Sequence, residues 1–199
     1  MQDQDKEEKL IGAVRQAYSA AADRPGDRHA FPVGRQFAES VGYPRDLLDG
    51  LPEQSVVAFA GVSNLGITAE IPEGSVVLDL GCGAGLDAMI AAKRSGPNGK
   101  VIGIDFSEPM IARARSAAEN ARLGNIEFHS ADAAVLPVPD QSIDVALVNG
   151  IFNLNPNREG IFRELARVVR PGGAVYAAEL VLKDPGTTRI EQTPANWFA

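Results

Sequence analysis

From residue 75 onward, short apolar runs alternate with helical patterns. Runs of strand length lie at 75–81, 100–107, 143–150 and 173–182, and a shorter, half-polar run lies at 126–132. Runs with so little polar alternation are typical of strands that are covered on both faces. Because helical patterns separate them, we expect right-handed βαβ crossovers between parallel strands. The sequence therefore predicts an α/β fold with a doubly wound, mostly parallel sheet.

The helical patterns between the runs have recognisable ends. Helices are expected at 86–94, 108–122 and 158–169. Ser107 is in position to cap the start of the second helix, and Pro109 suits its first turn. The third pattern ends at the turn residues "RPGG". These ends support the same succession of strands and helices.

Residues 1–70 lack this alternation. Apolar residues at three- and four-residue steps predict a helix at 6–22. Prolines, glycines and charges at 23–44 give no clean period, which is typical of a loop-rich segment, and two short helical patterns follow it. We therefore expect residues 1–70 to form an N-terminal helical cap or lid, packed on a single domain formed by residues 71–199.

Composition and charge restrict the partners and the compartment. The net charge is −7, so the chain lacks the basic surface that nucleic acid or an anionic membrane attracts. The N-terminus is charged and no apolar run is long enough to span a bilayer. One cysteine and two histidines make a poor zinc site. The sequence predicts a soluble, cytoplasmic protein with no metal site and no nucleic-acid or membrane partner.

A glycine-rich turn follows the first run and carries a carboxylate just before it. Gly81, Gly83 and Gly85 form G-x-G-x-G, but Leu86 stands where the dinucleotide fingerprint needs its third glycine. A pyrophosphate at the start of the next helix would be repelled by the preceding Asp79. A cationic ligand would be attracted. S-adenosylmethionine carries an ammonium and a sulfonium, so this turn favours it over NAD.

Two more acids end the next two runs. Asp105 lies 26 residues after the first acid, where its carboxylate can accept hydrogen bonds from both hydroxyls of a ribose. Phe106 and Met110 are expected to flank the adenine. Asp132 is expected to accept from the adenine amino group, beside the backbone N–H of Ala133. Because parallel strands end at the same edge of a sheet, the three acids predict one binding site there.

The motifs, in order, resemble those of the Rossmann-like S-adenosylmethionine-dependent methyltransferases. They are "VLDLGCGAG", "VIGIDFS", "SADAAVLPVPDQSIDVAL" and "LARVVRPGGAVY", and they cover roughly residues 75–182. The resemblance implies a Rossmann-like methyltransferase fold, S-adenosylmethionine as methyl donor and S-adenosylhomocysteine as product. It also implies an enzyme that moves a methyl group to an acceptor by in-line displacement.

Within this class the chain looks most like the arsenite methyltransferase branch. "VRQAYSAAA", "VGYPRDLLDGLPEQSVVAFAGVSN", "SGPNGKVIGIDFSEPMIARAR" and "VNGIFNLNPNREGIFRELARVVRPGG" carry that likeness. The branch holds trivalent arsenic with several cysteine thiolates, yet Val62 and Gly150 stand where two of these cysteines are expected. The only thiol, Cys82, lies in the cofactor turn, where we expect it to pack against the cofactor. The arsenic-binding cysteines are therefore missing.

Residues of the acceptor site are harder to read. Tyr18, His29, Tyr43 and Asn149 are candidates because they lie in the N-terminal segment or at the end of the fourth run. Asn149 is also a candidate for contact with the methionine part of the cofactor, or for a turn. Asn64 is expected either to contact the methionine end of the cofactor or to make a hydrogen bond within its own loop. No residue among these is assigned a catalytic role.

We expect a methyltransferase that acts on a small-molecule acceptor. One alternative is an arsenite or metalloid methyltransferase that uses external thiols or a missing C-terminal segment, and another is a non-catalytic cofactor-binding protein. The class resemblance implies a final helix and hairpin after the fifth strand, and the residues after 182 are too few for them. We therefore expect either a natural chain that continues past Ala199 or a homodimer that covers the fifth-strand edge.

Overall fold

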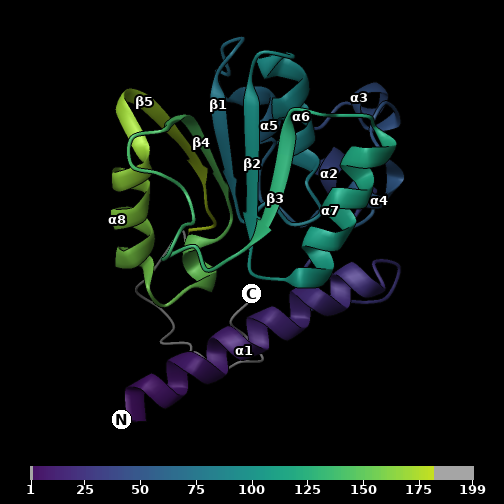
Figure 1. Cartoon of the computed structure of the whole chain (residues 1–199). Helices are drawn as coiled ribbons and strands as arrows, with labels where there is room; N and C mark the ends of the chain where they lie inside the picture. Colours follow the sequence, from purple (N-terminus) through teal and green to yellow (C-terminus); the bar gives the residue numbers. More distant parts are fainter. Residues whose placement is uncertain (1, 182–199) are drawn as a thin grey trace.

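A five-stranded, all-parallel sheet forms the centre of the protein, in the order β3-β2-β1-β4-β5 (Figure 1). The computed structural model describes residues 2–181, with side chains from residue 8 onward. The predicted doubly wound α/β fold is confirmed. The expectations for the residues after 181, including the missing hairpin, lie outside the described residues. The strands are β1 (Val76–Leu80), β2 (Lys100–Asp105), β3 (Ile126–Ser130), β4 (Ile143–Asn149) and β5 (Val169–Ala178).

Helices cover both faces of this sheet. Along β1, Val77 points to a cluster with α6 (Leu86–Ser95) and α7 (Glu108–Asn120), whereas Leu78 and Leu80 point to the opposite face. That opposite face packs against α8 (Arg158–Val168). Because side chains alternate along a strand, the uninterrupted apolar runs supply both clusters at once.

The N-terminal segment folds into five helices, of which α1 lies at one end of the core and the four shorter ones lie beside α6 and α7 (Figure 1). Helix α1 runs across the carboxyl ends of the strands and contacts α7. Buried side chains of the shorter helices, such as Leu48 and Val56, pack against Met89 of α6. None of the helices in the described part of the chain is long and apolar enough to cross a membrane. The five helices are α1 (Gln2–Asp23), α2 (Arg35–Ser40), α3 (Arg45–Asp49), α4 (Glu53–Val56) and α5 (Leu65–Thr68).

Two local predictions need correction. Ser107 occupies the N-cap position of α7, but its hydroxyl hydrogen-bonds to the hydroxyl of Ser19 on α1 at 3.0 Å instead of capping the helix. The fifth strand begins at Val169, earlier than predicted, because the "RPGG" residues lie in a register shift rather than in a separate turn. Both departures arise from contacts with residues that are distant in the sequence.

Candidate cofactor and acceptor pocket

A pocket lies at the carboxyl ends of the strands, between α1, residues 55–61 and the loops that follow β1 and β4. It brings together most of the residues that the sequence indicated. Asn64, His29 and Tyr43 are not among its lining residues. The predicted residues that line it are Tyr18, Asp79, Gly81, Cys82, Gly83, Asp105, Phe106, Met110, Asp132, Ala133 and Asn149.

The glycine turn shapes the floor of this pocket. Gly81 and Gly83 have φ values of +78° and +51°, a left-handed conformation that side chains disfavour. A Cβ at Gly81 would collide with Ile151, whereas a Cβ at Gly83 would meet only the Met110 sulfur, at 4.0 Å. The backbone at Gly83 is therefore open to a ligand.

Asp79 is buried next to this turn with part of its carboxylate unpaired. Its side chain is 1% exposed, and within the described part of the chain its Oδ2 has no hydrogen-bond partner. Burial raises the pKa of Asp79 well above its usual range, and the nearby Asp87 and Asp105 raise it further. A buried, unpaired carboxylate oxygen is costly unless a donor meets it. The site therefore suits a ligand that brings a cation or a strong donor.

Asp105 and Asp132 lie at the ends of the next two strands, as expected. Asp105 is buried, and its two oxygens accept hydrogen bonds from Gly83 N at 2.9 Å and Ser107 N at 2.8 Å. Burial raises the pKa of Asp105 to about 6 although these backbone donors lower it. Asp132 is exposed at the pocket edge, and its Oδ1 accepts from Ala134 N at 2.8 Å. Each carboxylate is held by backbone groups, so its position is fixed before a ligand arrives.

Aromatic and apolar groups of α1 close one side of the pocket. The Tyr18 and Phe106 rings meet edge to face at a centroid distance of 6.4 Å. The Arg15 guanidinium lies 5.7 Å from the centre of the Phe106 ring. Burial raises the pKa of Tyr18, and Asp105 raises it further, so its hydroxyl stays protonated. Sequence patterns did not single out Arg15 as a pocket residue.

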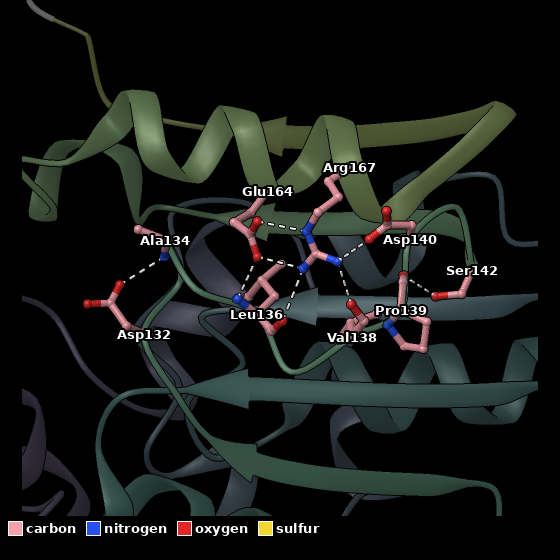
Figure 2. A network of polar contacts seen from close by, with 9 residues as sticks. All are labelled: Asp132, Ala134, Leu136, Val138, Pro139, Asp140, Ser142, Glu164 and Arg167. Atoms are coloured by element: carbon pink, nitrogen blue, oxygen red, sulfur yellow. Dashed lines mark hydrogen bonds and ion pairs between the residues drawn. The ribbon is translucent and has the colours of Figure 1, made fainter.

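The loop after β3, which carries Asp132, is clamped from α8 (Figure 2). Arg167 donates to Leu136 O at 3.0 Å, to Val138 O at 2.8 Å and to the carboxylate of Glu164. Glu164 in turn accepts from Leu136 N at 2.6 Å. Hydrogen bonding to Arg167 lowers the pKa of Glu164 to about 2. One ion pair therefore binds both backbone groups of Leu136 and fixes the path of the loop.

The remaining candidates have structural partners. The His29 Nε2 is 2.9 Å from Arg24 O, and Asn64 donates to Gly42 O at 3.2 Å. Tyr43 is 2% exposed and donates its hydroxyl to Asp87. Asp87 lines the pocket, and sequence reasoning missed it; its only signal was one acid among the apolar residues of α6.

Cys82 is buried beside the cofactor turn. Burial raises the pKa of its thiol well above the usual range, and Asp79 and Asp105 raise it further. A thiol in this setting stays protonated, and the thiolate is the form that binds soft metals. Cys82 is therefore a packing residue in this structure, with its sulfur facing the backbone of Gly83 and Gly103.

Comparison with known proteins identifies the family. A model described as "Methyltransferase domain" matches residues 71–198, which is more than half of the chain. The chain belongs to the methyltransferase domain family. An arsenite methyltransferase of Halobacterium salinarum is 34% identical over 157 residues, which are 79% of this chain and 40% of that protein. A demethylmenaquinone methyltransferase of Listeria welshimeri is 38% identical over 104 residues, which are 52% of this chain and 44% of that protein.

Solved structures agree with this assignment. An arsenic(III) S-adenosylmethionine methyltransferase from Chlamydomonas reinhardtii has a TM-score of 0.56 and 28% identity, and the match covers 74% of this chain and 49% of that one. The chain thus spans less than half the length of each of these three proteins. The family resemblance predicted from the ordered motifs is confirmed, and the arsenite branch is among its relatives.

Proposed function

We propose that this methyltransferase domain binds S-adenosylmethionine in the pocket at the strand ends and transfers its methyl group to an apolar small-molecule acceptor. The unpaired, buried Oδ2 of Asp79 carries the proposal, because it needs a donor and lies among pocket residues. The cofactor's ammonium meets that need. Asp105 would then accept from the ribose hydroxyls and Asp132 from the adenine amino group, with Phe106 and Met110 beside the ring.

The charge of the pocket supports a cationic ligand. Four carboxylates line it, those of Asp79, Asp87, Asp105 and Asp132, and Arg15 is the one cationic side chain among its described lining residues. Low-dielectric surroundings strengthen the attraction of these carboxylates for a positive ligand. The bound cofactor supplies a methyl carbon activated by an adjacent sulfonium. The carboxylates favour this charged donor over its uncharged thioether product.

The acceptor end of the pocket is apolar. Ala58, Phe59 and Ala60 line it from the N-terminal segment, and Ile151 and Leu154 line it from the loop after β4. These side chains exclude water and bind apolar surface, which favours a small apolar acceptor. Since the donor is already reactive, holding the acceptor in line with the methyl group supplies most of the rate enhancement. Side chains of α1 and of residues 55–61 line the pocket, which supports a role of the N-terminal segment as its cap.

Metalloid methylation is the second candidate, favoured by the arsenite methyltransferase relative. Val62 and Gly150, where the resemblance expects cysteines, are neighbours: a Cβ built on Gly150 would lie 3.1 Å from Val62 Cγ1. The described residues thus place an apolar contact where two thiols would bind arsenic. This candidate therefore requires thiols that this sequence does not supply, either external ones such as glutathione or those of a further C-terminal segment.

Calorimetry with S-adenosylmethionine tests the cofactor assignment. Asp105→Asn should weaken binding by about 1–3 kcal/mol, or roughly 5- to 150-fold, since it removes charge-assisted hydrogen bonds. The matched control is Asp27→Asn, because Asp27 is an exposed acid that pairs only loosely with Arg24. Unchanged affinity in Asp105→Asn would contradict the proposal, and so would tight binding of NAD.

Methyl-labelled cofactor tests the acceptor. A panel of hydroquinones, phenols and amines is compared with arsenite in the presence of glutathione. Label transfer to an apolar organic acceptor is expected. Transfer only to arsenite would instead establish the second candidate.

A further inference from the structure

A buried hydrogen-bond network connects α6, β4 and the N-terminal segment beside the pocket. At its centre is Asp87, which is 5% exposed in the first turn of α6. Its Oδ1 accepts from the Tyr43 hydroxyl and from Gly66 N at 2.9 Å. Its Oδ2 accepts from Asn149 Nδ2 at 2.9 Å. One carboxylate thus binds three elements that are distant in the sequence.

Asn149 completes the network from the end of β4. Its Oδ1 accepts from Val62 N at 2.9 Å and Ser63 N at 3.1 Å, and its Nδ2 donates to Ser63 O at 2.8 Å as well as to Asp87. The carbonyl oxygen and the NH₂ group of this side chain therefore each make two hydrogen bonds, which uses the full capacity of both. Although Asn149 lines the pocket, its polar atoms are bound to the backbone of residues 62–63 and to Asp87.

The backbone packs closely on these two side chains. A Cβ at Gly61 would lie 2.6 Å from Asn149 Nδ2, and a Cβ at Gly66 would lie 2.5 Å from Asp87 Oδ1. Glycine at both ends lets segment 61–66 lie directly against the pair. Gly61 also lines the pocket, so the positions of Asp87 and Asn149 set the position of the pocket wall at Gly61.

We propose that Asp87 and Asn149 are positioning residues, which hold segment 61–66 and thereby fix Gly61, the residue of that segment that lines the pocket. They act through the wall rather than on the reacting atoms. The inference rests on the proposed function for its ligand, but amide exchange tests the network without that ligand. The proposal gives Asp87 a role, and it changes the role expected of Asn149 from contact with substrate or cofactor to support of the pocket wall.

The geometry allows a reciprocal exchange of the two residues. In Asp87→Asn, one amide N–H faces a second donor, because the three groups around position 87 all donate hydrogen bonds. In Asn149→Asp, two carboxylates face each other. In the double variant, the amide introduced at position 87 would donate to the carboxylate introduced at position 149. Both side chains would keep their bonds to the other donors; the bond to Ser63 O is lost, and a carboxylate oxygen faces that carbonyl instead. Net charge is also restored.

Two measurements decide the proposal, each made on the wild type, the two single variants and the double variant. Amide hydrogen exchange of residues 62–66 should accelerate about 10-fold or more in each single variant and return to within about 3-fold in the double variant. S-adenosylmethionine affinity, measured by calorimetry, should weaken about 10-fold in each single variant and recover in the double variant. Asn120→Asp, on α7 and away from the pocket, controls for an added charge.

The direction in which each variant changes S-adenosylmethionine affinity separates a positioning role from a purely electrostatic one. If the carboxylates acted only by their field on the cationic cofactor, Asp87→Asn would weaken binding and Asn149→Asp would strengthen it. Opposite signs would overturn the proposal, and so would wild-type exchange in the single variants or a double variant no better than either. If a single variant fails to fold, Tyr43→Phe removes one bond to Asp87 and should accelerate the same amides. Failure of the wild type to bind S-adenosylmethionine would refute the proposed function, while the exchange rates would still decide the network.

Discussion

The ion pair between Glu164 and Arg167 should stabilise the fold in a pH-dependent way. Glu164→Gln keeps the size of the side chain but removes the charge that Arg167 contacts at 2.7 Å. It also leaves Leu136 N facing an amide instead of a carboxylate. We expect this variant to loosen the loop after β3 and to lower the free energy of unfolding.

The size of the effect follows from the shifted pKa. Hydrogen bonding to Arg167 lowers the pKa of Glu164 from 4.5 to about 2. At 1.36 kcal/mol per pKa unit, this shift sets a ceiling of about 3.4 kcal/mol. The Arg167 side chain is 32% exposed, so solvent screening reduces the expected loss to about 1–2 kcal/mol. Because the folded-state pKa is the lower one, the stabilisation is complete above about pH 4.5 and is lost as the pH falls towards about 2.

Urea unfolding at neutral pH and at about pH 3 measures this difference. The two proteins should differ by about 1–2 kcal/mol at neutral pH and by less than half of that at about pH 3. Glu159→Gln is the matched control, because Glu159 pairs with Arg163 on the same helix at 3.2 Å with both side chains largely exposed. It should change stability by less than about 0.5 kcal/mol. An equal loss for Glu164→Gln at both pH values would refute the electrostatic argument.

Three further predictions concern the pocket. Affinity for S-adenosylmethionine should fall as the pH drops below about 6, where Asp105 gains a proton, and calorimetry on Asp105→Asn should show this dependence reduced. Gly83→Ala should weaken cofactor binding, since its Cβ projects into the pocket at a φ of +51°, whereas Gly124→Ala, with open space around it, should leave binding unchanged. Cys82→Ala should keep cofactor binding, and titration with arsenite should give the same weak affinity for the wild type and the variant. Micromolar binding of arsenite by the wild type alone would contradict the packing role of Cys82.

The strands and the acids at their ends could be predicted because they depend on local sequence. Residues such as Val77 and Leu78 must both be apolar when helices cover both faces of a sheet, so the run itself indicates a central strand. The carboxyl ends of parallel strands meet at one edge, and so Asp79 and Asp105 come together whatever the loops do. The bonds of Asp87 could not be predicted, since its partners come from loops and strands far along the chain.

The division between predictable and unpredictable residues has a functional meaning. The proposed cofactor end is built from the glycine turn and strand ends, whose positions the sheet fixes. The proposed acceptor end is built from residues 58–61 and from residues of the loop after β4, which the sheet does not align. In the structure, Asn149 at the end of β4 accepts hydrogen bonds from Val62 N and Ser63 N, which follow the first segment. A Cβ built on Gly150 would lie 3.1 Å from Val62 Cγ1 at this junction, outside the sheet, so we expect exchanges at these two positions to change the acceptor without disturbing the cofactor site. Under the proposed function, an apolar residue paired with glycine at this junction favours an organic acceptor, whereas two thiols in the same places would favour a soft metalloid.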